Sequence, residues 1–145
     1  MLKAEREGPI LRLTLDRPEV RNAFDESLIA ALRGAFASVT PDIRAVVLSG
    51  NGEAFCAGGD LNWMRRAADQ TFAENEADAL RLAHMLQAVR DCPALTIARI
   101  HGACFGGGCG LAAAVDVAIC ADDAKFAFSE VRLGLIPATI APFVL

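Results

Sequence analysis

The 145-residue sequence has no apolar run long enough to cross a membrane. A membrane-spanning helix requires roughly 18–20 consecutive apolar residues. The two most apolar stretches, residues 94–100 and 111–121, are shorter and are interrupted by Arg99 and Asp116. The N-terminal segment, MLKAEREGPI, is charged and lacks the apolar stretch and small-residue cleavage site of a secretory signal. We therefore expect no membrane association and a cytoplasmic location.

The patterns of metal sites and disulfides are also missing. No C-x-x-C pair occurs, and neither histidine has a ligand-like neighbour at metal spacing. An odd number of cysteines in apolar surroundings favours small, reduced, buried side chains. We expect no metal site and five buried thiols, at Cys56, Cys92, Cys104, Cys109 and Cys120.

The sequence has no basic field of the kind that attracts nucleic acid. Its formal net charge is −4, and it offers no lysine-rich face. Nucleic-acid binding depends on clustered positive charge. This function is disfavoured, and a phosphate-bearing ligand would need a local basic site.

The chain consists of short helix-like and strand-like segments separated by Pro, Gly and Asp, which is typical of an α/β domain. No repeat or linker divides it, so residues 1–145 are expected to form one domain. The segment DDAKFAF, residues 122–128, resembles a hairpin. Apolar periodicity predicts strands at residues 10–15, 44–50, 94–100 and 115–121, and helices beginning after Asp25 and covering 71–91 and 107–114.

Two loops are rich in glycine. Residues 54–61 read AFCAGGDL and residues 104–110 read CFGGGCG; each loop follows a strand and precedes a helix-like segment. Glycine costs roughly 0.5–1 kcal/mol relative to alanine in a helix or strand, so such clusters indicate a close approach to the backbone. Two bare loops can offer two N–H groups to a thioester oxygen on which enolate charge develops. The positive N-terminal end of the helix predicted at residues 107–114 would also stabilise this negative charge.

Other glycine-rich sites fit less well. The spacing Gly108-x-Gly110-x-x-Ala113 is that of a dinucleotide site, but the next strand begins too early for a crossover helix. No Gly-Lys-Ser/Thr of a P-loop and no G-x-S-x-G nucleophile elbow is present. Tight packing of a helix on a strand stays open as a structural explanation of the glycines.

Three segments resemble the enoyl-CoA hydratase/isomerase family, also called the crotonase family. They are DRPEVRNAF, AFCAGGDL and HGACFGGGCGLAAAVDVAICADDAKFAFSEVRLGLIP, in the family's order and over almost the whole chain. The resemblance implies an α/β fold with a β/α spiral core that assembles into trimers or dimers of trimers. It also implies an acyl-CoA thioester as ligand, so that coenzyme A is part of the substrate and no separate cofactor is required.

The resemblance assigns catalytic roles to three residues. In the family's F-x-A-G-x-D-L motif an alanine amide is the first oxyanion donor, and this position falls on Ala57. The middle glycine of the triplet supplies the second donor, and it falls on Gly107. Glu130 matches the glutamate that serves as acid or base, and its structural alternative is a rim ion pair with Arg132.

The resemblance also places coenzyme A on the first loop. Arg21 is either a neighbour of its phosphates or a solvated surface charge. Asp60 can also cap the helix that follows it, and Trp63 and Met64 either line an acyl pocket or pack in the core. The residues expected to contact the substrate, besides Arg21, are Ala57, Gly58, Gly59, Asp60, Leu61, Gly106 and Gly107.

Gly110 departs from the hydratase pattern, in which a glutamate at this position helps a second carboxylate to hold and split water. Glu130 alone could move a proton between the α and γ carbons of an enoyl thioester, so isomerisation is the alternative to hydration. The last segment, SEVRLGLIPATIAPFVL, resembles bacterial hydratases that act on methylglutaconyl-CoA and related branched substrates in leucine or isoprenoid breakdown. We expect hydration.

Members of the family continue into a C-terminal helical region that helps to close the acyl pocket and to build the trimer. We expect residues 1–145 to form the fold core without that region. The alternative to an enzyme is a truncated, non-catalytic core that binds coenzyme A without turnover. The apolar tail IPATIAPFVL predicts exposed hydrophobic surface and self-association.

Overall fold

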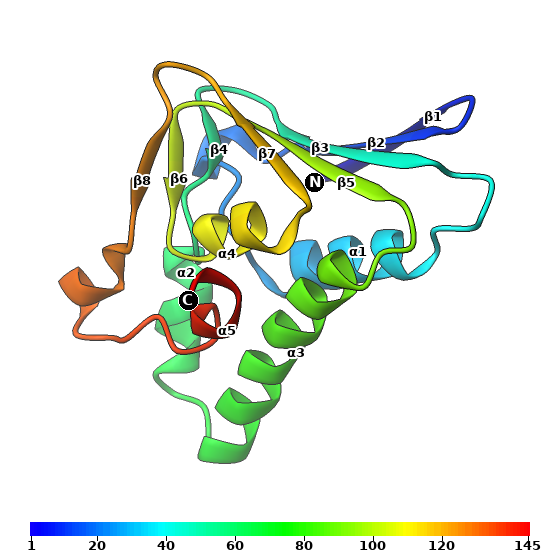
Figure 1. Ribbon diagram of the computed structural model, residues 1–145. Coiled ribbons are helices and arrows are strands. Elements are labelled where there is room, and N and C mark those ends of the chain that lie inside the picture. The colour runs from blue at the N-terminus through cyan, green and yellow to red at the C-terminus, as the bar shows by residue number, and fades with distance from the viewer.

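The computed structural model describes all residues from 1 to 145 and consists of two sheets and a layer of helices (Figure 1). The larger sheet has the strand order β1-β2-β3-β5-β7, and the smaller sheet has the order β4-β6-β8. The strands are β1 Leu2–Glu7, β2 Ile10–Leu15, β3 Ala45–Gly50, β4 Ala54–Cys56, β5 Leu95–Ile100, β6 Ala103–Phe105, β7 Val117–Cys120 and β8 Lys125–Ala127. The helices are η1 Pro18–Val20, α1 Glu26–Ala37, α2 Leu61–Ala67, α3 Phe72–Arg90, α4 Gly107–Ala114, η2 Ser129–Leu133 and α5 Ala141–Val144.

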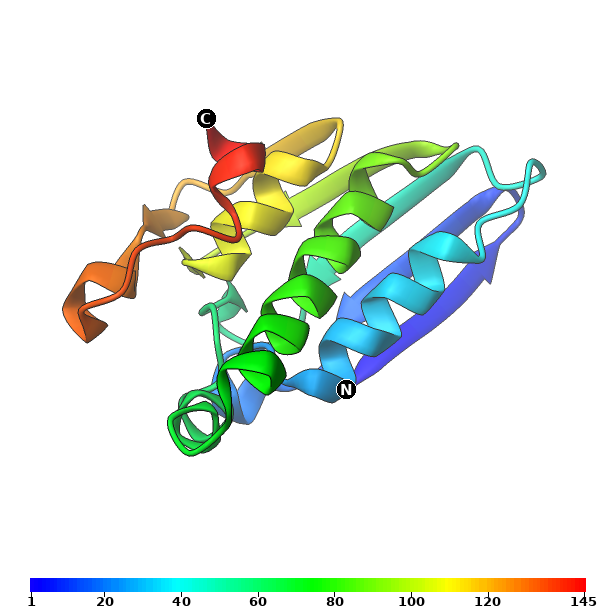
Figure 2. The same cartoon turned by 90° about the horizontal axis from the view of Figure 1, so that it is seen from below.

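The chain follows the same path three times. A strand of the larger sheet leads into a short strand of the smaller sheet and then into a helix, in the units that begin with β3, β5 and β7. Within each sheet these strands pair in parallel. The helices α1, α3 and α4 lie side by side over one face of the larger sheet (Figure 2). This winding is the β/α spiral that the family resemblance implies.

The core lies between the larger sheet and the helix layer. Asp25 is the N-cap of α1 and accepts a hydrogen bond from the Leu28 N–H at 2.8 Å. From there helical spacing buries one apolar stripe, as it does in the second half of α3. Burying each such side chain contributes about 1.5–3 kcal/mol, so this interface holds the layers together. The buried helix residues are Leu28, Ile29, Leu32, Phe36, Met85, Leu86 and Val89.

The prediction of a hairpin at residues 122–128 is wrong. β7 pairs with β5, whereas β8 pairs with β6 in the other sheet. Between them the chain turns a corner, where the Ala124 N–H donates to the Ala121 carbonyl at 3.0 Å. Turn residues in a sequence indicate a change of direction, but they do not show which strand the next segment will pair with.

The C-terminal edge of the molecule is poorly covered. β7 and β8 are the last strands of their sheets, and their residues are exposed. Cys120 on β7 is therefore exposed, contrary to expectation, and Cys92 is half-buried, whereas Cys56, Cys104 and Cys109 are buried. No helix of the structure is both long and apolar enough to cross a membrane. The outer apolar face consists of Val117, Ile119, Phe126, Phe128, Val131, Leu133, Leu135 and Ile136.

Candidate active site

The two glycine loops meet because β4 and β6 are neighbours in the smaller sheet and each leads directly into its loop. A Cβ atom added at Gly58 would lie 3.0 Å from the Phe105 carbonyl oxygen and 3.6 Å from the Gly107 nitrogen. Gly58 and Gly106 also have φ angles of +94° and +50°, in the left-handed region that favours glycine. Part of the glycine content is thus explained by the contact of the two loops with each other.

Several backbone N–H groups in these loops have no acceptor, and two of them belong to residues that line the same cavity. The N–H of Asp60 is hydrogen-bonded, but that of Gly59 forms no hydrogen bond. Gly107 is the first residue of α4, and the first N–H groups of a helix have no acceptor within it. No turn or loop hydrogen bond uses the Gly107 N–H either. Both glycines line one cavity, so two unpaired donors lie beside the same space.

The structure contradicts the expected donor role of Ala57. Its N–H donates to the Arg21 carbonyl at 3.0 Å, so it is not free for a substrate oxygen. Ala57 lines only an outer groove, whereas Gly59, two positions later, lines the inner cavity as well. The motif alone does not show which N–H is left free once the loop has bonded to residues 21–24. In this loop, Gly59 is the residue that lines the inner cavity and has an unpaired N–H.

Glu130 lies in η2, against the second loop. Its Oε1 atom would be 2.8 Å from a Cβ added at Gly106, and its Oε2 atom is buried without a hydrogen-bond partner. Glu130 takes part in no ion pair, so the rim pair with Arg132 does not form. A buried oxygen without a partner in a cavity wall is a position at which water or a ligand can bind.

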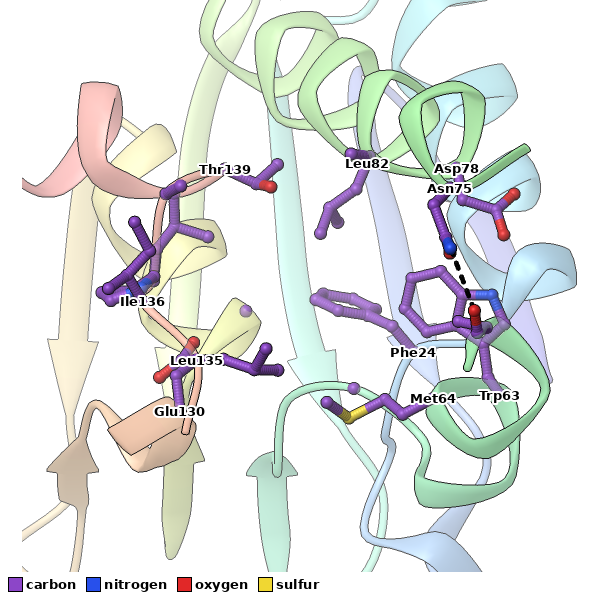
Figure 3. Close-up of a pocket in the computed structure, with 17 residues that line it drawn as sticks. Phe24, Trp63, Met64, Asn75, Asp78, Leu82, Glu130, Leu135, Ile136 and Thr139 are labelled. Carbon is purple, nitrogen blue, oxygen red and sulfur yellow. Dashed lines mark hydrogen bonds between the residues drawn. The ribbon is translucent and has the colours of Figure 1, made fainter. Parts of the chain in front are cut away.

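The inner cavity has a volume of about 260 Å³ and a mostly apolar lining. Figure 3 shows Phe24, Trp63 and Met64 on one side and Glu130, Leu135 and Ile136 on the other. Trp63 and Met64 therefore line this pocket. Phe24 and the tail residues 135–140 were not expected in the site, because neither periodicity nor spacing in the sequence indicates that the tail folds over the loops.

An outer groove of about 660 Å³ adjoins the cavity, and Gly59 and Glu130 line both. The structure thus brings together all the residues expected near coenzyme A except Gly107, which lines only the inner cavity. The Arg21 side chain is exposed at the groove. The groove residues named from the sequence are Arg21, Ala57, Gly58, Gly59, Asp60, Leu61 and Gly106.

Asp60 is the N-cap of α2, as expected. Its Oδ1 accepts hydrogen bonds from the N–H groups of Asn62 and Trp63, and its Oδ2 pairs with Arg17 at 3.1 Å. Burial alone would raise the pKa of Asp60, but these amides and the guanidinium outweigh it and lower the pKa. Both carboxylate oxygens are occupied within the protein, and the backbone N–H and carbonyl of Asp60 are bonded to Phe24 and Met64, so each polar group of Asp60 already has a partner.

Gly110, where the hydratase pattern has a glutamate, has no open space for a side chain. A Cβ atom there would lie 2.6 Å from Ile140 Cγ2 and 3.3 Å from Leu86 Cδ1. Ile140, in the tail, is 2% exposed and lines the inner cavity. An apolar side chain therefore occupies the space that a second carboxylate would need. No group of three His, Cys, Asp or Glu side chains is placed to hold a metal ion.

Two unpaired N–H groups from neighbouring loops and a carboxylate without a partner thus line one mostly apolar cavity. The family model for enoyl-CoA hydratase/isomerase matches residues 5–145, and the chain belongs to this family. An enoyl-CoA hydratase of Alternaria alternata is 35% identical over 137 residues, which is 93% of this chain and 44% of that protein.

Solved structures of enoyl-CoA hydratases are also similar to this chain. The crystal structure of an enoyl-CoA hydratase from Shewanella pealeana has a TM-score of 0.93 and 40% identity, covering 99% of this chain and 55% of that one. An enoyl-CoA hydratase/isomerase from Marinobacter aquaeolei has a TM-score of 0.90 and 42% identity, covering 99% and 57%. The chain thus spans about half the length of the relatives that it matches.

Proposed function

We propose that this chain carries the acyl-CoA site of an enoyl-CoA hydratase and adds water to a 2-enoyl-CoA thioester. The observation that supports this most directly is that the free N–H groups of Gly59 and Gly107 and the carboxylate of Glu130 line one cavity. Two N–H donors suit an oxygen that gains negative charge. A carboxylate without a partner suits proton transfer.

The proposed reaction begins when the thioester oxygen accepts hydrogen bonds from Gly59 and Gly107. A water molecule held by Glu130 attacks C3 and gives a proton to the carboxylate, while the electron pair moves to the thioester oxygen. When the enolate collapses, C2 takes that proton from Glu130. The product carries the hydroxyl group on C3 and the proton on C2, and the carboxylate is restored. Each N–H donor stabilises the transition state by about 3–4 kcal/mol.

Coenzyme A would lie in the outer groove as part of the substrate, with its acyl group in the inner cavity. The backbone of the first loop lines this groove, and Arg21 and Arg65 are its positive side chains. We propose no other cofactor, no metal and no nucleic-acid partner. The methylglutaconyl group stays a prediction for the acyl part.

Isomerisation of a 3-enoyl-CoA is the second candidate, and Ile140 favours it. Because this side chain occupies the space beside Gly110, Glu130 is the only carboxylate on its side of the cavity, and the other carboxylate of the lining, Asp78, lies on α3 on the opposite side (Figure 3). In this reaction Glu130 would remove a proton from C2 and return it to C4. A core that binds coenzyme A without turnover is the third candidate, since the chain spans about half of its relatives.

Self-association is proposed on separate grounds. The outer apolar face exposes large side chains such as Val131 at 76% and Ile136 at 80%. Exposed apolar patches of this kind usually mark interfaces. Light scattering at micromolar concentration tests this prediction, and a stable monomer would contradict it. The trimer and the cytoplasmic location stay predictions.

The test of the function is a turnover screen of this chain against crotonyl-, 3-methylglutaconyl- and 3-enoyl-CoA, with calorimetry on acetyl-CoA. Hydration of either 2-enoyl substrate supports the first candidate, and conversion of the 3-enoyl substrate without hydration supports the second. Binding without turnover supports the third. A folded sample that does not bind acetyl-CoA at millimolar concentration would contradict all three.

A further inference from the structure

Phe24 connects the two proposed donors. Its backbone N–H donates to the Gly58 carbonyl at 2.7 Å, and its carbonyl accepts from the Asp60 N–H at 2.8 Å. In such a parallel pairing the residues on either side of Gly59 face Phe24, so the peptide N–H of Gly59 itself points the other way. This ladder leaves the Gly59 N–H unpaired and fixes its direction.

The Phe24 ring lies against the second donor. A Cβ atom added at Gly107 would be 2.6 Å from Phe24 Cε2, and the ring is 1% exposed. One residue thus holds the first donor by its backbone and contacts the second by its ring. A displacement of residue 24 would change the separation of the two N–H groups.

Arg17 holds the segments on both sides of this contact. Its Nη1 atom donates to the Ala23 carbonyl at 2.6 Å and lies 3.1 Å from Asp25 Oδ2. Its Nη2 atom lies 3.1 Å from Asp60 Oδ2. Ala23 and Asp25 flank Phe24, and Asp60 follows Gly59. The guanidinium therefore links the two extended segments that form the Phe24–Gly59 ladder.

We propose that Arg17 is a positioning residue for the oxyanion site and acts through Asp60 and the Phe24 ladder on the Gly59 N–H. Its side chain is 16% exposed, so solvent screens these contacts only weakly. A planar guanidinium can reach a carbonyl and two carboxylates at once, whereas a lysine ammonium cannot match this fork. The requirement for arginine follows from this geometry.

This inference rests on the proposed function, because it needs the Gly59 N–H to bind the thioester oxygen. The competing explanation is that Arg17 only joins the N-caps of α1 and α2, which are Asp25 and Asp60. A structural role of that kind would change the free energy of unfolding but not the stabilisation of a bound enolate.

The experiment uses 3-oxobutanoyl-CoA, which ionises to an enolate that absorbs in the near ultraviolet. Its bound enolate fraction reports on the two donors, while calorimetry gives its dissociation constant. The variants are Arg17→Lys and Asp60→Asn, each checked for folding by circular dichroism. Arg66→Ala is the matched control, because Arg66 also joins α2 to α1, through an exposed pair with Glu26 at 2.9 Å.

We expect Arg17→Lys to lower the bound enolate-to-keto ratio about tenfold or more while the dissociation constant changes less than about threefold, since misplacing an oxyanion donor affects mainly the charged form. Asp60→Asn should act in the same direction. The double variant Arg17→Lys/Asp60→Asn should lower the enolate-to-keto ratio no further than Arg17→Lys alone. The two side chains interact directly, so the effects of the two substitutions should not add. Arg66→Ala should leave the ratio unchanged.

Folded Arg17→Lys with the wild-type enolate ratio would overturn the inference and leave the proposed function standing. The same holds if Arg17→Lys and Asp60→Asn both unfold, since the role would then be structural. A wild-type chain that binds 3-oxobutanoyl-CoA without raising its enolate fraction would overturn both proposals. The two failures are therefore distinguishable.

Discussion

The two glycine loops are held in different ways. The loop at residues 57–60 is fixed by backbone hydrogen bonds to residues 21–24 and by the Arg17–Asp60 pair. The loop at residues 106–110 is fixed mainly by contact, because a Cβ at Gly107 would meet the Phe24 ring and one at Gly108 would lie 2.5 Å from the Cys56 carbonyl oxygen. The first loop should therefore tolerate a small side chain at Gly59 but not the loss of its polar partners, and the second loop should show the reverse.

The largest effect should come from Glu130, which lines the cavity together with both donors. Glu130→Gln keeps the shape but removes the proton acceptor, so turnover should fall about 10²–10⁴-fold for hydration and isomerisation alike. Steady-state rates on crotonyl- and 3-enoyl-CoA measure this. Arg132→Gln, on the same short helix, is the control; full activity in folded Glu130→Gln would exclude the one-carboxylate mechanism.

The comparison of the loops is tested directly by adding one methyl group to each. Gly107→Ala places Cβ 2.6 Å from Phe24, so turnover should fall about a hundredfold and the free energy of unfolding by about 1–3 kcal/mol. Gly59→Ala meets only the flexible end of Met64, with the sulfur at 3.2 Å, and turnover should fall less than about tenfold.

Gly34→Ala is the control for these variants. Nothing lies within 4 Å of a Cβ at this position in α1, so the substitution should raise the free energy of unfolding by about 0.5–1 kcal/mol. Urea unfolding and turnover of all three variants give the comparison. Equal losses in Gly107→Ala and Gly59→Ala would show that the two loops are held alike.

Gly110→Glu tests whether the second loop can carry another carboxylate. Because Ile140 occupies that space, the single variant should lose about 1–3 kcal/mol of stability with little gain in hydration. The double variant Gly110→Glu/Ile140→Ala should raise the ratio of hydration to isomerisation above that of Ile140→Ala. An unchanged ratio in a folded double variant would show that residue 110 does not face the reacting carbons.

Substitution of Arg21 tests whether its positive charge in the outer groove contributes to the binding of coenzyme A. If it contacts the phosphates of coenzyme A, Arg21→Ala should weaken binding of acetyl-CoA about three- to tenfold at low salt and less at high salt. Calorimetry at two salt concentrations measures this, with the exposed Arg33→Ala on α1 as control. Equal affinity in the variant and the wild type would show that Arg21 is a solvated surface charge that does not contact coenzyme A.

The smallest effect should be a pH dependence at Asp60. Its pKa is lowered in the folded protein, so it stabilises the fold at pH values above its unfolded pKa of about 3.9, and this contribution is lost as the pH falls through the folded value. The difference in free energy of unfolding between wild type and Asp60→Asn should be constant near neutral pH and should shrink below about pH 4. A difference that does not vary with pH would contradict this.

Local patterns predicted the regular elements well. The strand at residues 10–15 and the helix at 107–114 have the predicted bounds, and the stripe Met85, Leu86 and Val89 is buried. β1 was missed because its charged sequence, LKAERE, shows no apolar alternation and pairs at an exposed edge. The three-residue strands β4 and β6 were missed because they are too short to show a period.

The sequence by itself determined the family, the longer helices and strands, and the glutamate and glycine loops proposed for the site, since each depends on residue types at short spacings. Only the tertiary structure decided which N–H stays free. The N–H of Ala57 is used by Arg21, whereas that of Gly59 is left over because residues 58 and 60 bond to Phe24. Only the fold of the tail placed Ile140 beside Gly110. Both depend on contacts between segments far apart in the chain, which no local pattern encodes.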